Sequence, residues 1–247
     1  MFNLACAYHD AGKLDLAIPL YEETLRLQKA KLGSNHPHTL QCMNNLALAY
    51  QAAGKLDQAL PLLEETLRLT KAKLGPNHPE TLDTMGNLGV AYCDAKQGEN
   101  AGQMLKEYIA CQRKRVPKDN PRFAGLLAQV ALKLLNCEQF DIAEEMLREC
   151  LAIREKKEPE AWTTFNTMSM LGGSLLGQKK YADAEPLLLK GYEGISSRLV
   201  SEGQNPELLK AQKQRLGQAV DWLIELYAAL DKPDEVKKWQ AEKAKLK

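Results

Sequence analysis

The sequence predicts an all-α fold, in the form of a right-handed α-solenoid of about six antiparallel helix pairs. Its composition favours helices, because Ala, Leu, Glu, Lys and Gln are abundant while Val and Ile are scarce. The chain also repeats itself with a period of 42 residues, and 25 of its first 33 residues are identical to those of residues 43 to 75. Helix pairs repeated in this way stack into a solenoid, since neither helix can bury its apolar face alone.

The first helix of a repeat is clearest in the run PHTLQCMNNLALAYQAAG, residues 37–54. Its apolar residues recur at helical spacing from Leu40 to Tyr50, which indicates one buried face. Pro37 suits a first helical turn, where its missing N–H group costs nothing. Gly54 can adopt the left-handed conformation that ends many helices. We call this helix A of the repeat.

The second helix, helix B, is predicted in the run LDQALPLLEETLRLTKAKLG, residues 56–75. The small residues Ala47 and Ala59 are expected at the place where helices A and B cross, because they let the two backbones approach closely. The tyrosines Tyr8, Tyr50 and Tyr92 occupy one position of the 42-residue period. We expect them to be buried at helix crossings.

The repeats predict one solenoid over residues 1–247, with a last repeat that has diverged into a polar C-terminal cap. Met1 lies inside the first helix A, without the His-Pro lead that opens later repeats, so we expect the chain to be a piece of a longer protein. The predicted repeats are residues 1–33, 34–75, 76–117, 118–157, 158–203 and 204–247.

The composition excludes several functional classes. Lys and Arg total 33 and Asp and Glu total 32, so the net charge is +1 and no basic surface for nucleic acid is predicted. No apolar run approaches the roughly 20 residues that cross a membrane, and the N-terminus lacks a signal peptide. The six cysteines form no CxxC pair and are expected to be free thiols. These features predict a cytoplasmic protein.

Three patterns that could indicate chemistry have simpler structural explanations. Residues 172–179 resemble a phosphate-binding loop, but the lysine is one place late and no strand precedes it, which favours a close helix crossing. His36 and His78 fall at one repeated turn, so helix capping is favoured over metal binding. Cys6 and His9 lack a third residue to orient them. We therefore predict no catalytic residue, no metal, no cofactor and no enzymatic activity.

Several of these residues together resemble the signature of tetratricopeptide repeats. The 42-residue period and the NHPETL motif are similar to the longer variety found in kinesin light chains. Residues 158–194 also resemble the tetratricopeptide tails of bacterial Ser/Thr protein kinases, although no kinase motif is present. The residues that carry the first resemblance are Leu46, Ala47, Tyr50, Gly54, Leu56, Ala59 and Leu63.

The resemblance implies a peptide-binding groove lined by the helices A. The family's groove asparagines hydrogen-bond the ligand backbone, and Asn44 matches that position. Asn3, Asn45 and Asn87 recur one residue later, and either of two roles is open for them: lining the groove or bonding between helices. The groove residues implied by register are Asp10, Gln41, Asn44, Asn45, Leu48, Gln51, Asp83, Asn87, Val90 and Asp94.

The function expected is a protein–protein interaction scaffold that binds an extended peptide or partner protein in this groove. The resemblance to bacterial kinase tails implies that this scaffold is the regulatory or docking tail of a bacterial Ser/Thr kinase. Helices A of the first three repeats contain Asp10, Asp83 and Asp94 but no Lys or Arg. We therefore expect an apolar ligand with some basic character and no binding of acidic chaperone tails. The alternative is a structural module that self-associates end to end through its uncapped N-terminal repeat.

Overall fold

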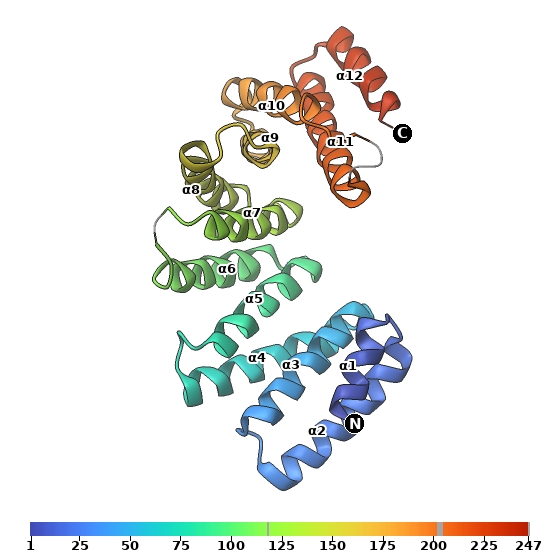
Figure 1. Ribbon diagram of the computed structural model, residues 1–247, viewed down its shortest axis with the longest axis vertical. Helices are drawn as coiled ribbons and strands as arrows, with labels where there is room; N and C mark the ends of the chain where they lie inside the picture. The colour runs from blue at the N-terminus through green and yellow to red at the C-terminus, as the bar shows by residue number, and fades with distance from the viewer. Residues whose placement is uncertain (118, 202–204, 247) are drawn as a thin grey trace. The chain divides into compact units, whose positions relative to one another are not determined.

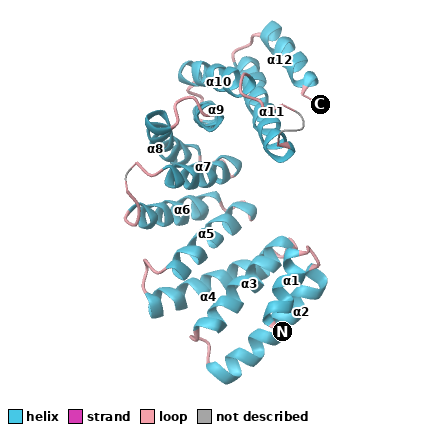
Figure 2. Cartoon of the chain, viewed as in Figure 1, coloured by secondary structure: helices cyan, strands magenta, loops and turns pink. Residues whose placement is uncertain are grey.

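A computed structural model describes residues 1–117, 119–201 and 205–246. In this part of the chain all regular structure is helical and no strand occurs, which confirms the all-α prediction (Figure 2). The helices group into two compact units, Met1–Arg115 and Val116–Lys247. None of the described helices is both long enough and apolar enough to cross a membrane.

The first unit contains three helix pairs, each joined by a short turn (Figure 1). Each predicted repeat of this unit holds one pair, whose members are helix A and helix B as defined from the sequence. Whether all six repeats form one solenoid stays a prediction. The helices are α1 (Phe2–Asp10), α2 (Leu14–Leu32), α3 (Pro37–Ala52), α4 (Leu56–Leu74), α5 (Pro79–Asp94) and α6 (Gly98–Arg113).

The helices A begin and end where the sequence predicts. The Nδ1 atom of His36 accepts a hydrogen bond from the backbone N–H of His38 at 3.2 Å, and His78 accepts one from Glu80 at 3.3 Å. Both histidines therefore cap helices, as expected. Gly54 ends α3 with a positive φ of 73°, a conformation that costs glycine little.

The core of the first unit depends on small residues at fixed positions of the repeat. Ala17, Ala59 and Ala101 recur every 42 residues in the helices B, and all three have no exposed surface. Ala47 is equally buried in α3, and Gly89 takes its place in α5. A Cβ atom on Gly89 would lie 2.6 Å from the Leu105 side chain, so a larger residue there would require Leu105 to move. Close approach of helices A and B is thus confirmed.

The repeated tyrosines are less buried than predicted. Tyr50 and Tyr92 are half-buried: each ring packs against the core, but each hydroxyl reaches the surface. There the Tyr50 hydroxyl donates to Glu22 of α2 at 2.6 Å, and the Tyr92 hydroxyl donates to Glu64 of α4 at 2.7 Å. A tyrosine at this position joins its own helix to helix B of the preceding repeat, which requires a polar end at the surface.

The second unit also consists of three helix pairs, but its core is organised around one helix. Every residue from Thr164 to Leu176 of α9 is buried, because α7, α8, α10 and α11 all contact this helix. The helices are α7 (Pro121–Asn136), α8 (Phe140–Lys157), α9 (Trp162–Gly177), α10 (Tyr181–Ser196), α11 (Pro206–Ala229) and α12 (Pro233–Lys245).

Glycines allow this close packing around α9. A Cβ atom on Gly173 would lie 2.5 Å from the Trp222 ring of α11, and one on Gly194 would lie 2.0 Å from Phe165. Gly172 and Gly173 both lie inside the continuous helix α9. The pattern at residues 172–179 therefore serves helix packing, as the sequence favoured, and does not form a phosphate-binding loop.

The final helix, α12, is held against α10 by one aromatic residue. Trp239 is buried, and its ring meets that of Tyr192 edge-on with 4.8 Å between the ring centroids. The Tyr192 hydroxyl also donates a hydrogen bond to Glu242 at 3.3 Å. The rest of α12 is largely charged and exposed, in keeping with the polar cap that the sequence predicts.

Candidate functional site

The predicted groove residues of the first unit lie on the helices A, which contact one another from α1 to α3 and from α3 to α5. His36 and His78 fix the starts of α3 and α5 at equivalent positions, so side chains 42 residues apart lie on equivalent faces. Between α3 and α5 is a cavity of about 180 Å³, which we call the amide cavity. It is lined by Leu40, Gln41, Asn44, Asn45, Thr70, Glu80, Asp83 and Thr84.

Asparagine side chains bond across the helices at this cavity. The Asn87 amide nitrogen donates to the Asn44 side-chain oxygen at 3.1 Å, linking α5 to α3. The Asn45 amide nitrogen lies 3.6 Å from the Cys6 sulfur, a weak bond from α3 to α1. Asn45 lines the cavity, and both Asn45 and Asn87 bond between helices, which is one of the two roles that the sequence left open. That they line a peptide-binding groove stays a prediction. The bond to Asn87 uses only the Asn44 oxygen and leaves the Asn44 N–H groups available to a ligand.

The other predicted residues lie outside the cavity. The Gln51 amide nitrogen donates to the Asp94 carboxylate at 2.6 Å, a second polar link between α3 and α5. Leu48 and Val90 occupy equivalent positions of these two helices and are half-buried. Asp10 is exposed at the end of α1. The structure therefore brings Gln41, Asn44, Asn45 and Asp83 together and places the remaining residues along the same helices.

The amide cavity has a negative character. Burial raises the pKa of the Asp83 carboxyl group, and the Arg115 cation lowers it only partly. Glu80 contributes a second carboxyl group, whose Oε2 atom is buried and has no hydrogen-bond partner among the described atoms. A buried acceptor without a partner costs free energy, so a donor that entered the cavity would be bound favourably.

Four cavity residues were not among the predicted groove residues: Leu40, Thr70, Glu80 and Thr84. Glu80 could have been found, because it precedes Asp83 by three residues and therefore shares its helical face. The Thr84 hydroxyl donates a hydrogen bond to the Glu80 backbone oxygen at 2.8 Å. This hydroxyl proton is therefore not available to a ligand, and Thr84 only lines the cavity. Thr70 belongs to helix B, and its presence follows only from how α4 packs against α5.

The side chains around the amide cavity offer groups of the kind that hydrogen-bond a polypeptide. The amides of Gln41 and Asn44 can donate to and accept from a peptide backbone, and the carboxylates of Glu80 and Asp83 suit a basic side chain. Among the described residues, no three His, Cys, Asp or Glu side chains are grouped as a metal site would need.

Comparison with known families identifies the repeats. Family models described as tetratricopeptide repeats match residues 1–72, 47–114 and 124–157. Together these matches cover more than half of the chain. A comparison with curated proteins gave no match.

Similar solved structures agree with the family models. A crystal structure described as kinesin light chain nearly identical TPR-like repeats, from Podosopora anserina, has 26% identity and a TM-score of 0.71, covering 81% of this chain and 95% of that chain. BtubC (BKLC) from P. vanneervenii has 19% identity and a TM-score of 0.62, covering 82% of this chain and 80% of that chain. The apo form of RapI has 12% identity and a TM-score of 0.64, covering 99% of this chain and 73% of that chain. The last two similarities show the fold alone.

Proposed function

This chain belongs to the tetratricopeptide repeat family, and we propose that it is a non-enzymatic scaffold whose first unit binds an extended segment of a partner protein. The observation that carries the proposal is the amide cavity, where Gln41, Asn44 and Asn45 of α3 face Asp83 of α5. Side-chain amides bind a peptide backbone whatever its sequence, and flanking residues then provide selectivity.

The proposed ligand has apolar side chains and one or two basic residues. Leu48 and Val90, which are half-buried on neighbouring helices, would contact its apolar side chains. Glu80 and Asp83 would pair with a lysine or arginine. Because the Asp83 side chain is exposed, salt would screen part of this attraction, and the affinity should fall as the ionic strength rises.

Acidic chaperone tails do not fit this surface. A terminal carboxylate that leaves water needs charged donors, yet α1, α3 and α5 contain no Lys or Arg. These helices instead carry Asp10, Asp83 and Asp94. Acidic tails should therefore be repelled and show negligible binding.

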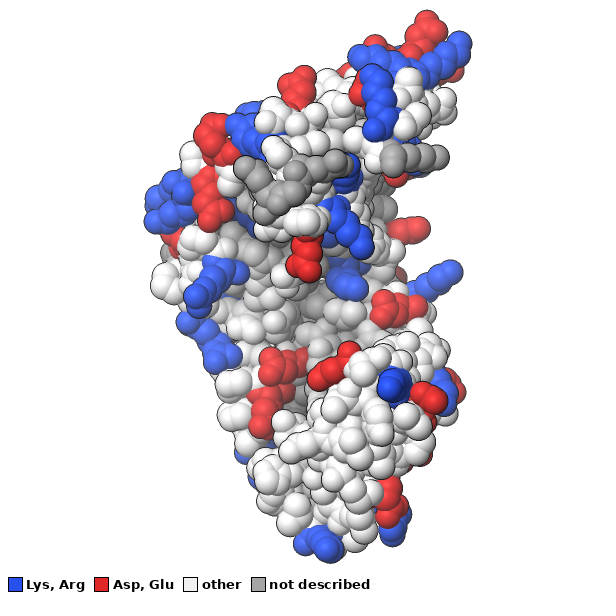
Figure 3. All heavy atoms as spheres, turned by 45° about the vertical axis from the view of Figure 1, so that its right-hand side comes forward, with Lys and Arg blue, Asp and Glu red and all other residues white. Residues whose placement is uncertain are grey.

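We propose that the protein is cytoplasmic and that it binds neither nucleic acid nor membranes. All six cysteines carry free thiols, which is typical of a reducing compartment. Acidic and basic side chains are interspersed over the face seen in Figure 3, in keeping with the net charge of +1. We further propose that the module acts as a regulatory or docking tail of a bacterial Ser/Thr kinase, a role supported by the resemblance of residues 158–194 to such tails.

Selection of ligands from a random peptide library displayed on phage tests the proposed ligand. We expect the selected peptides to be enriched in apolar residues together with Lys or Arg, and to bind less tightly as salt increases. Selection of Asp- and Glu-rich peptides by the first unit would contradict the proposal. The proposal would also be contradicted if the selected peptides did not compete with one another for binding, because they would then not share one site.

A second function is favoured by exposed apolar residues near the N-terminus. Met1, Leu4, Leu16 and Leu32 are 58%, 50%, 44% and 47% exposed, which is unusual for large apolar side chains. We propose self-association through this end as the alternative to partner binding. Light scattering should then show a mass that rises with concentration and returns to that of a monomer when Leu4→Lys and Leu16→Lys are combined. A monomer at all concentrations would exclude this alternative.

A further inference from the structure

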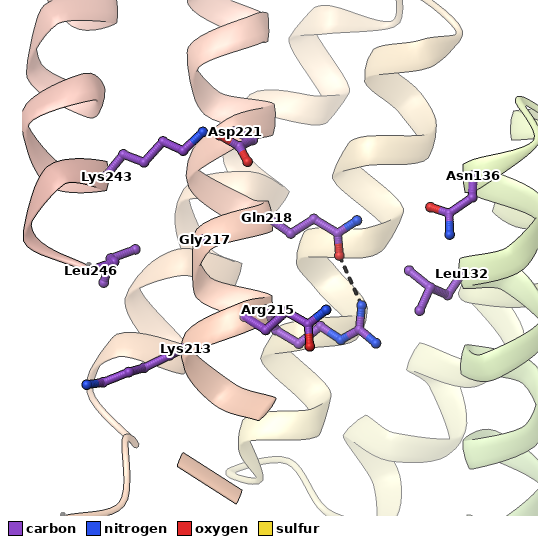
Figure 4. A pocket seen from close by; sticks show the side chains of 10 residues that line it. Leu132, Asn136, Lys213, Arg215, Gly217, Gln218, Asp221, Lys243 and Leu246 are labelled. Carbon is purple, nitrogen blue, oxygen red and sulfur yellow. Dashed lines mark hydrogen bonds and ion pairs between the residues drawn. The ribbon is translucent and has the colours of Figure 1, made fainter. Parts of the chain in front are cut away.

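A second cavity, in the other unit, has the opposite chemical character. It lies between α7, α11 and α12 and has a volume of about 550 Å³, within the range of ligand-binding pockets. We call it the Arg215 pocket. Leu132 and Asn136 of α7 face it from one side, and α11 supplies most of the opposite wall (Figure 4).

Arg215 is the central feature of this pocket. Its guanidinium group is partly buried, and this burial lowers its pKa. Its one hydrogen-bond partner among the described residues is neutral: Nη1 donates to the Gln218 side-chain oxygen at 3.1 Å. Figure 4 shows both side chains extending from α11 towards Leu132 and Asn136. Partial burial of a cation without a counter-ion costs desolvation free energy. An anion that bound beside Arg215 would offset part of this cost.

The charges around Arg215 leave this cation uncompensated. Asp221 is the one carboxylate among the lining residues, and it forms an ion pair with Lys243 of α12 at 2.5 Å. Because this carboxylate is already paired, Arg215 leaves the pocket positive, whereas the amide cavity of the first unit is negative.

We propose that the Arg215 pocket binds a single carboxylate group, carried by an acidic side chain of a partner polypeptide. A planar guanidinium group binds a planar carboxylate through two parallel hydrogen bonds. The Gln218 amide lies beside Arg215, and the Asn136 amide faces the pocket from α7, so both can donate further hydrogen bonds to the carboxylate (Figure 4). Leu132 and Leu246 also line the pocket and would contact apolar residues next to the acidic one.

A carboxylate fits this pocket better than a phosphate group. A phosphate carries nearly two negative charges and would lie in the same cavity as Asp221, whose carboxylate repels it. Asp221 is already paired with Lys243, so that lysine is only partly available. A long acidic tail is disfavoured for the same reason. The pocket therefore selects one carboxylate among otherwise uncharged neighbours.

Gly217 keeps the pocket open. It lies inside α11, and a Cβ atom added to it would meet nothing within 4 Å. A leucine at this position would therefore be accommodated by the fold, yet its side chain would fill part of the cavity. This makes Gly217→Leu a variant that blocks the pocket without removing any of its charges.

NMR titration with blocked amino acids tests the proposal. The probe is N-acetyl-glutamate amide, and the readout is the shift of the backbone amide signals of Gly217 and Gln218 in the full chain. We expect a saturable shift with a dissociation constant in the millimolar range. N-acetyl-glutamine amide, which has the same shape without the charge, should give no saturable shift, and blocked phosphoserine should bind more weakly than the glutamate probe.

Variants separate the pocket from general surface charge. Arg215→Gln and Gly217→Leu should each abolish the shift, with thermal unfolding monitored to show that both variants fold. Asp221→Asn should strengthen binding severalfold, because it removes the competing carboxylate; a merely unfolded variant could not bind more tightly. Equal binding by wild type and Arg215→Gln, the absence of saturation in the wild type, or tighter binding of phosphoserine would overturn the proposal.

Discussion

The hydroxyl groups of Tyr50 and Tyr92 connect successive repeats of the first unit. Each donates to a glutamate 28 residues earlier, on helix B of the preceding repeat. Tyr227 makes a bond of the same kind to Glu185 in the second unit, at 2.8 Å. Because the acceptor is charged, such a bond is stronger than one between neutral groups, although solvent at the surface weakens it.

Replacing Tyr50 with Phe tests this contact. The ring and its packing are kept while the hydrogen bond to Glu22 is lost, so we expect the free energy of unfolding to fall by about 1 kcal/mol in chemical denaturation. Tyr8→Phe is the matched control, because Tyr8 occupies the same repeat position in α1 but donates to no described glutamate. Equal effects of the two substitutions would show that the Tyr50 hydroxyl contributes nothing specific.

The same hydroxyls predict how stability depends on alkaline pH. Burial is the larger cause, and the hydrogen bond to Glu22 the next, of a rise in the pKa of Tyr50 from 10.0 to about 12. The pKa of Tyr92 is raised to about 12 for the same reasons, with Glu64 as the hydrogen-bond acceptor. A raised pKa means that the folded protein favours the protonated tyrosine. The stability gained is therefore complete below pH 10 and is lost as the pH rises towards 12. The advantage of wild type over Tyr50→Phe should disappear across this interval; an advantage that stayed constant to pH 12 would contradict the assignment.

At the scale of the helix, the ends of the helices A follow the 42-residue period even where the residue type changes. Gly12 and Gly54 have φ values of 71° and 73°. At the equivalent positions of the next repeats, Lys96 and Glu138 have φ values of 57° and 61°. A side chain makes this conformation unfavourable by about 1 kcal/mol, so packing of the repeats imposes the turn against the local preference.

Lys96→Gly should therefore stabilise the protein. Removing the side chain relieves the strain at positive φ, and we expect the free energy of unfolding to rise by up to about 1 kcal/mol. Gly54→Ala, at the equivalent turn, should have the opposite effect of similar size. Thermal unfolding of both variants measures the difference, and destabilisation by Lys96→Gly would show that the lysine side chain has a role beyond the turn.

The sequence predicts these elements well because their causes are local. Pro37 and Pro79 begin helices, glycines end them, and Ala47 and Ala59 lie at crossings, all as local sequence and period imply. The half-burial of Tyr50 was not predicted, because its acceptor Glu22 lies on another helix. A bond between helices was one of the two roles left open for Asn87, but its partner Asn44 was not predicted, because the bond joins residues 43 positions apart whereas the period aligns Gly86 with Asn44.

At the scale of the whole chain, the sequence is most informative where the repeats are regular. The Arg215 pocket was not predicted as a whole. Leu132 and Asn136 keep the 42-residue register of Val90 and Asp94, but an insertion before α11 disturbs the period, so Arg215 and Gly217 could not be aligned. The formation of this pocket depends on how α7 and α11 each pack against α9, which is a property of tertiary packing. The two cavities differ in charge, so a chain with a net charge of +1 offers two distinct surfaces to partners.

The central claim is that the amide cavity binds the partner polypeptide, and one measurement tests it most directly. Calorimetric titration of a library-selected peptide should be compared between wild type and the double variant Asn44→Ala with Asp83→Ala. The control is Asp57→Ala with Gln103→Ala, two exposed residues on helices B outside the cavity.

We expect the cavity variant to bind at least tenfold more weakly, a loss of about 1.4 kcal/mol in binding free energy, because it removes backbone hydrogen bonds and the partner of a basic side chain. The control variant should bind like the wild type. Unchanged affinity in the cavity variant, with its fold intact by circular dichroism, would contradict the assignment of this site.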